Sequence, residues 1–313
     1  MSTLPVSCFG KLPFHREFLR IGLGTPGAAS VVHWVDGAHA AWSRSGDSPA
    51  ETPLVRFAMA TEHGGVVAGV VRQSSDGLRR HPVAFFIEDP ARVARPDWPL
   101  LPLALAGPWT ELSALSARSW DDHDALTAAL AAGTATLDWE AARAARREAL
   151  AVPCPGSPWE ALTGVRGDDA RHVAANLLAV AEAQRAARSP AEGVSVALPL
   201  PSDPGLAPSR ASLWLELLDL AAGMAESGPA IALADTPPRL VAFYRPPEGP
   251  DLAAVLSSLD MAPIDDLAEA WQTLPAAGSE RARAVDALVG TAATGTLGDL
   301  PGRLGNEIGR AHV

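Results

Sequence analysis

The chain has 313 residues, a formal net charge of −11, 48% hydrophobic residues and 19% charged residues. This length and composition fit a globular protein with a buried core and room for two domains of ordinary size. The acidic balance argues against nucleic acid and anionic membranes as general partners, since both select a basic surface, although it leaves room for a local basic patch.

Cysteine usage and hydropathy both point to the cytoplasm. Cys8 and Cys154 are the two cysteines, too few for a disulfide framework, and we expect both to be reduced thiols. Residues 1–20 are interrupted by Lys11, His15 and Arg20 and lack the apolar core of a signal peptide. No stretch approaches the roughly 20 apolar residues needed to cross a bilayer. We therefore expect a cytoplasmic protein.

Residues 1–97 are predicted to form a sheet-and-helix domain. Val6 to Leu12 is a candidate strand that ends at Pro13, and residues 28–42 place apolar side chains on one helical face. Further strands are predicted at residues 54–60, 65–73 and 82–87. Because short turns join these strands, we expect an antiparallel sheet with the helix packed on it.

A helical segment is predicted over residues 98–190. Its best candidates are Asp121 to Ala132, Asp138 to Leu150 and Asp168 to Ala187, with residues 152–158 as a break or linker. Asp168 or Asp169 lies near the start of the third helix, where a carboxylate suits the helix dipole. We interpret the tryptophans scattered over the helical regions as core anchors, with one or two available to an interface: Trp109, Trp120, Trp139, Trp159, Trp214 and Trp271.

Residues 191–262 are predicted to form a second α/β unit, followed by a helical or flexible tail over residues 263–313. The unit contains strand patterns at residues 193–200, 229–234 and 239–244, and helix patterns at residues 209–225 and 252–259. The tail is interrupted by the Gly- and Thr-rich stretch at residues 290–298. The whole chain is therefore expected to have a mixed α+β fold.

The usual catalytic motifs are missing from the sequence. The eight histidines form no His-Glu-x-x-His pattern, and neither a Gly-x-Ser-x-Gly elbow nor a phosphate loop is present. The acidic pairs Asp121-Asp122 and Asp265-Asp266 both precede predicted helices, so we interpret them as capping and dipole-complementing residues. We therefore expect no catalytic residues, metal site or cofactor.

Lys11 is the only lysine of the chain, because 24 of its 25 basic residues are arginines. A compact ammonium and a planar guanidinium are not interchangeable, so a single retained lysine is a candidate for a specific role; codon bias is the alternative. Arg79 and Arg80 follow a predicted turn at Asp76. They are either a solvated hairpin end or a small basic contact point near Lys11 and Arg16.

Residues 8–19, Cys-Phe-Gly-Lys-Leu-Pro-Phe-His-Arg-Glu-Phe-Leu, resemble the opening signature of the TagF/ImpM family of type VI secretion-associated proteins. That signature is Phe-Gly-Lys-Leu-Pro, a short spacer and Asp-Phe. Further similarity lies in residues 53–58, in Asp76 followed by Arg79-Arg80-x-Pro82, and in residues 198–201 and 212–214, so it covers roughly residues 6–260. The chain departs from the family in having Arg16-Glu17 where the family has Gly-Asp, and in a shorter turn after Asp76.

The resemblance implies a non-enzymatic cytoplasmic regulator that represses type VI secretion after translation and binds a forkhead-associated scaffold protein. It also implies an N-terminal fold similar to longin-like or profilin-like domains. On this basis the candidate partner-binding residues are Lys11, Arg16, Glu17, Asp76, Arg79 and Arg80. The alternatives are a metal-assisted hydrolase that uses Asp76 or a histidine, and a structural accessory component of the secretion machine.

Overall fold

We describe a computed structural model of the protein. It describes residues 3–45, 53–75, 80–133, 135–154, 156–187, 189, 193–223, 228–257, 264–269, 273–290 and 295–310. The side chains of Arg16, Ser45 and residues 307–310 are outside this description.

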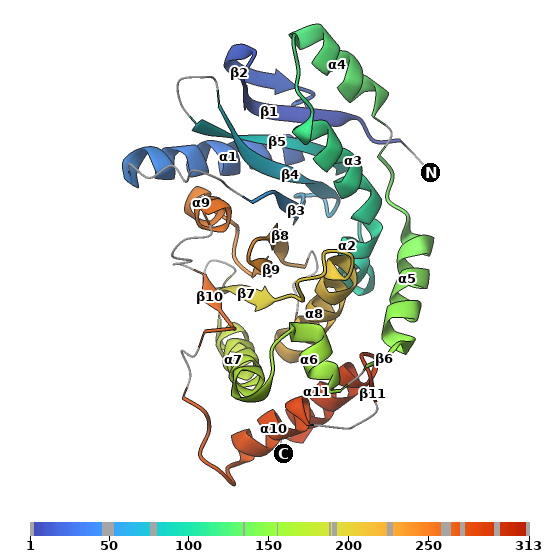
Figure 1. Ribbon diagram of the computed structural model, residues 1–313, viewed down its shortest axis with the longest axis vertical. Helices are drawn as coiled ribbons and strands as arrows, with labels where there is room; N and C mark the ends of the chain where they lie inside the picture. Colours follow the sequence, from blue (N-terminus) through green and yellow to red (C-terminus); the bar gives the residue numbers. More distant parts are fainter. Residues whose placement is uncertain are drawn as a thin grey trace.

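One nine-stranded sheet runs through the molecule, in the order β10-β7-β9-β8-β3-β4-β5-β1-β2 (Figure 1). Neighbouring strands are antiparallel except for β10 and β7, which are parallel. The strands are β1 (Val6–Leu12), β2 (His15–Ile21), β3 (Val55–Ala60), β4 (Val66–Ser75), β5 (Arg80–Asp89), β7 (Ser195–Pro199), β8 (Ala230–Asp235), β9 (Pro238–Phe243) and β10 (Asp265–Asp266).

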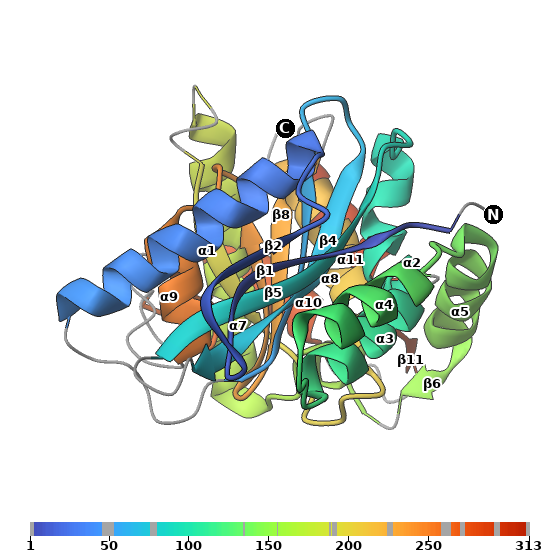
Figure 2. The ribbon, with the colours of Figure 1, turned by 90° about the horizontal axis from the view of Figure 1, so that it is seen from above.

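Helices cover both faces of this sheet (Figures 1 and 2). On one face, α1 (Pro26–Ser45) and α9 (Gly249–Ser257) bury an aromatic-rich core around Trp34, Phe57 and Phe243. The other face is covered by a larger group: α3 (Ala106–Ala117), α4 (His123–Ala132), α6 (Pro158–Thr163), α7 (Gly167–Ala186), α8 (Ala207–Ala222), α10 (Glu280–Val289) and α11 (Asp299–Arg310). The connection after β5 adds η1 (Arg95–Leu100) and α2 (Leu101–Ala104), and α5 (Trp139–Ala151) packs against α2 and α8.

Tryptophans anchor the second, larger core, as the sequence predicted. Trp98, Trp109, Trp159 and Trp214 are each almost fully buried. Each indole N–H donates to a backbone carbonyl, at 3.1, 3.2, 3.0 and 2.9 Å respectively. A buried tryptophan fixed in this way contributes a large apolar surface without leaving its polar atom unsatisfied.

The α+β class and the antiparallel sheet are confirmed, but the sequence missed β2. Pro13 ends β1 as expected, yet Pro13 and Phe14 form a tight turn that pairs Leu12 with His15. The chain then returns as β2, whose sequence His-Arg-Glu-Phe-Leu-Arg-Ile lacks the clean alternation of a half-buried strand. An edge strand with charges on it is often hard to recognise for this reason.

Segments 1–97 and 191–262 both contribute strands to the one sheet. Their meeting point is the antiparallel pair β3–β8, in which Val55 lies opposite Ala234 and Ala58 opposite Ile231. The division of the chain into four segments stays a prediction. Within the tail, α10 and α11 bury Val285, Leu288, Leu300 and Leu304 in the larger core.

Two short strands hold part of the predicted linker and of the Gly-rich interruption together. β6 (Pro153–Cys154) pairs with β11 (Gly295–Thr296), and Ser157 caps α6 while its hydroxyl donates to the Val289 carbonyl (2.8 Å). Residues 155 and 291–294 lie outside the described residues. Among the helices described above, none is long and apolar enough to cross a bilayer.

Helices α1 and α9 cross at a contact between two glycines. A Cβ atom on Gly249 would lie 2.2 Å from the carbonyl carbon of Gly37, and one on Gly37 would lie 2.9 Å from the Cα of Gly249. Because the obstructing atoms belong to the backbone, no side-chain rotation can relieve the overlap. The glycines therefore set the separation of the two helices.

We expect Gly249→Ala to lower the free energy of unfolding by about 1–3 kcal/mol, since the new methyl group must push α1 and α9 apart. Urea denaturation followed by circular dichroism measures the change. Gly302→Ala is the matched control, because Gly302 is an exposed glycine of α11 with open space around it. An equal loss of stability in both variants would contradict the prediction.

Candidate functional site

The Phe-Gly-Lys-Leu-Pro segment is part of β1 and of the turn that follows it. Phe9 and Leu12 are buried, on opposite sides of the sheet. Gly10 has φ of +135°, and a Cβ atom there would lie 2.6 Å from the Pro82 carbonyl oxygen. Three of the five residues are therefore required by packing or backbone geometry, whatever else the segment does.

Lys11 lies at an irregularity of the β1–β2 ladder. The register shifts between Gly10 and Leu12, as in a β-bulge, and such bulges change the direction of a side chain. The Lys11 ammonium lies 5.2 Å from the centre of the Phe18 ring, within the range of a cation–π contact. The side chain itself is half-buried.

An aromatic cluster of Phe9, Phe18, His39 and His81 surrounds this contact. Phe18 stacks on Phe9 with ring centres 5.6 Å apart, and its edge faces both imidazoles. The His39 and His81 ring centres are 4.1 Å apart, which links α1 to β5 beside the segment. No local pattern indicates this pairing, because the two histidines lie on a helix and a strand far apart in the chain.

An open hollow lies where the β1–β2 turn meets the ends of β4 and β5. Its volume is about 310 Å³, and it is lined by Pro13, Arg72, Gln73, Ser74, Ser75 and Arg80. We call it the Arg72 hollow. Two guanidinium groups with amide and hydroxyl neighbours make its described lining basic and polar.

The predicted site residues are only partly brought together. Arg80 is exposed and lines the Arg72 hollow beside Pro13, the last residue of the Phe-Gly-Lys-Leu-Pro segment. Glu17 is exposed on the edge strand β2. The side chain of Arg16 is not described, and Asp76 and Arg79 lie outside the described residues. The role of all six in partner binding stays a prediction.

Arg72 was missed by the sequence analysis. The one local signal is that Arg72 directly follows the apolar run Val-Val-Ala-Gly-Val-Val of β4 and begins its polar end. Burial lowers the pKa of the Arg72 guanidinium from its usual value.

Cys8 precedes the Phe-Gly-Lys-Leu-Pro segment and is fully buried. Burial raises the pKa of its thiol to about 12. The Cys8 thiol is therefore protonated at neutral pH and packs as a small apolar group.

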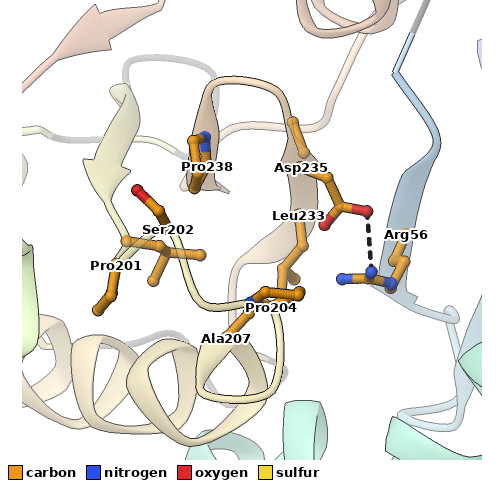
Figure 3. Close-up of a pocket in the computed structure, with 10 residues that line it drawn as sticks. Arg56, Pro201, Ser202, Pro204, Ala207, Leu233, Asp235 and Pro238 are labelled. Carbon is orange, nitrogen blue, oxygen red and sulfur yellow. Dashed lines mark hydrogen bonds and ion pairs between the residues drawn. The ribbon is translucent and has the colours of Figure 1, made fainter.

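A second pocket, of about 220 Å³, lies beside the junction of β3 and β8 (Figure 3). Pro201, Ser202 and Pro204 reach it from the loop between β7 and α8, and Pro238 comes from β9. The Arg56 guanidinium points at the Asp235 carboxylate across 2.9 Å (Figure 3). Because these two charges satisfy each other, the pair ties β3 to β8 and leaves little free charge for a ligand.

The acidic pairs have structural roles, one as predicted and one not. Asp122 caps α4 by accepting from the Ala125 N–H at 2.7 Å. The capping prediction for Asp265 and Asp266 is wrong, because these residues form β10. There the Asp266 carboxylate accepts from Arg239 at 3.1 Å and so neutralises a half-buried guanidinium.

Aspartates also begin α7 as predicted, since Asp168 and Asp169 occupy its first turn. Across the described part of the chain, no group of three or more His, Cys, Asp or Glu residues could hold a metal ion.

No protein-family model matches the sequence, and no curated protein is significantly similar to it. Among solved structures, the chain is similar to the crystal structure of PA0076 from Pseudomonas aeruginosa, at 26% identity and a TM-score of 0.36. The match covers 42% of this chain and 63% of PA0076, so the chain spans less than two thirds of that protein. At this TM-score the match carries no argument about fold or function.

We expect Lys11 and Gly10 to respond very differently to substitution. Lys11→Met keeps the alkyl stem and loses the charge over Phe18, so the free energy of unfolding should fall by about 1 kcal/mol or less. Gly10→Ala places a methyl group against backbone atoms at a positive φ and should cost about 2 kcal/mol or more. Urea denaturation of both variants measures the difference.

Lys11→Arg is the charge-preserving control for this pair. If Lys11→Met destabilised the protein as much as Gly10→Ala, Lys11 would be a structural residue. The distinction between a Gly10 that the fold requires and a Lys11 that it does not would then be wrong.

Proposed function

We propose that the protein is a non-enzymatic cytoplasmic regulator that represses assembly or firing of a type VI secretion machine by binding a forkhead-associated scaffold protein. The resemblance of residues 8–19 to the TagF/ImpM signature supports this proposal. The observation that carries it is the placement of that signature, whose last residue lines a basic, open hollow together with Arg80.

The residues of the signature differ in whether the fold requires them, and this difference also supports a role in binding. Phe9, Gly10 and Leu12 satisfy the core and the backbone, whereas Lys11 lies at a bulge and extends over Phe18. A bulge that redirects a side chain disrupts the strand ladder locally, so its presence favours a role beyond pairing. Partner contact is one such role, since cations at an interface steer and orient a charged partner.

The surface also has the character of a contact between proteins. The Arg72 hollow is open and shallow, its described lining is hydrophilic, and a protruding side chain of a partner could enter it from solvent. Deep, mostly apolar clefts are the usual sites for small substrates. The chemistry of the hollow therefore fits the recognition of a protein surface better than the turnover of a small molecule.

Deletion of the gene is expected to raise secretion of type VI effectors, and the wild-type gene supplied in trans should restore repression. The purified protein is expected to retain the forkhead-associated protein in a pull-down. Effector levels in culture supernatants, set against a cytoplasmic marker for lysis, provide the measurement. Lys11→Met should weaken repression at normal protein levels, and Arg283→Gln on α10 should leave it unchanged.

The outcome of deletion also separates the alternatives. Loss of secretion would indicate a structural component of the machine and would overturn repression. Bound metal in the purified protein, with an activity abolished by Asp76→Asn, would indicate a hydrolase. Unchanged secretion and recovery of no secretion component in the pull-down would leave the regulatory proposal without support.

A further inference from the structure

Arg72 carries a half-buried charge that the described structure does not compensate. Its guanidinium lies at the wall of the Arg72 hollow, and its Nε atom is enclosed by protein without a hydrogen-bond acceptor. Burial lowers its pKa from the usual value. An enclosed donor without an acceptor is costly, so Arg72 would gain from any anion that reached it.

Other arginines of similar burial are compensated. Arg56 pairs with Asp235 at 2.9 Å, and Arg239 pairs with Asp266 at 3.1 Å. The remaining examples are Arg146 with Glu216, Arg245 with Asp251, and Arg210, whose Nε donates to the Ala161 carbonyl. In this acidic protein a half-buried guanidinium therefore usually pairs with a carboxylate or donates to a carbonyl of the same chain.

The described lining of the hollow supplies no such group. Ser74 and Gln73 extend from β4 beside Arg72, Arg80 comes from the start of β5, and Pro13 closes the side toward the β1–β2 turn. None of these side chains is acidic, whereas the whole chain has a net charge of −11. Charge complementarity therefore points to an anion from outside the described chain.

We propose that the Arg72 hollow binds a single carboxylate side chain of an acidic segment on a protein partner. The inference rests on the proposed function, since a binding partner is what brings such a segment to the surface. The two terminal nitrogens of a guanidinium present a parallel pair of N–H donors that matches the two oxygens of a carboxylate. The hydroxyl of Ser74 adds a neutral donor beside them.

The charge balance favours a carboxylate over a phosphate group. Arg80 already takes part in an interaction of its own, which leaves Arg72 as the main uncompensated cation in the described lining. A carboxylate brings one negative charge, whereas a phosphate monoester brings nearly two at neutral pH. The single positive charge of Arg72 therefore matches the charge of a carboxylate.

The test is a titration of the full-length protein, labelled with ¹⁵N-arginine, with three probes at constant ionic strength. The probes are the peptide acetyl-Gly-Glu-Gly-amide, its glutamine counterpart and inorganic phosphate. The Arg72 Nε–Hε signal is identified as the one missing from Arg72→Lys. We expect the glutamate peptide to shift this signal saturably, and the glutamine peptide to leave it in place.

Variants locate the binding and control for the change of charge. Uniformly ¹⁵N-labelled Arg72→Gln is used so that the backbone amides of Gln73 and Ser74 report binding, which should weaken roughly tenfold or more because a charged hydrogen-bond pair is lost. Arg72→Lys should bind with intermediate affinity, because it keeps the charge and loses the two-donor geometry. Arg283→Gln removes the same charge from α10, at the opposite end of the molecule from β2, and should bind like the wild type (Figure 1).

Three results would overturn the proposal: no saturable shift with the glutamate peptide, an equal shift with the glutamine peptide, or tighter binding of phosphate than of the glutamate peptide. The last would assign the hollow to a phosphoryl group. Because the titration contains no secretion component, its failure leaves the repressor function standing. Conversely, a deletion without effect on secretion leaves the carboxylate site standing.

Discussion

The pairing of β3 with β8 is the constraint on which the rest of the architecture depends. It joins the five strands near the N-terminus to the four that follow the helical region, through matched residues from Val55 opposite Ala234 to Ala58 opposite Ile231. Without it, each half would end in an exposed central edge of unpaired backbone groups. The Arg56–Asp235 ion pair and the Trp109 donation to the Phe57 carbonyl reinforce the junction from side chains on both strands and on α3.

This junction also decides where a binding surface can form. The sheet continues in both directions from β3 and β8, and helices bury its faces from Trp34 on one side and Trp109 on the other. Surface for a partner is therefore left at the ends of strands and at the edge strand β2. The Arg72 hollow lies in such a place, where β4 ends, β5 begins and the β1–β2 turn approaches them. The folding core and the candidate site are thus separate, and substitutions in the hollow can change binding without opening the core.

Local patterns in the sequence were enough to predict most elements but not their association. The strand Val6–Leu12 and the helix over residues 28–42 were found because periodicity and a terminating proline are local signals. Three features were not accessible: the return of the chain as β2, the union of two strand groups in one sheet, and the pairing of Asp266 with Arg239. Each depends on residues brought together from different parts of the chain.

The same limit applies to the candidate site. Lys11 stood out as the only lysine, and Arg80 through its place in a resemblance, whereas Arg72 is the residue at which an apolar strand becomes polar. The importance of Arg72 depends on the lack of an acidic side chain beside it in the described lining. A half-buried arginine that faces a carboxylate would give no reason to expect a ligand. The absence of an acid in the described lining of a hollow, in a chain where arginines of similar burial are compensated, is a spatial property.

Lys11 carries an ammonium group and Arg72 a guanidinium group, and the two cations are stabilised in different ways. A compact ammonium is stabilised over the face of Phe18 and needs no partner in a fixed plane. A half-buried guanidinium that lines a hollow is best paired by an acceptor in its own plane. A lysine at position 72 would lack the planar pair of donors that a carboxylate needs. The Lys11 ammonium is stabilised by Phe18 of the same chain. The Arg72 guanidinium is paired, in our proposal, by a carboxylate of a binding partner.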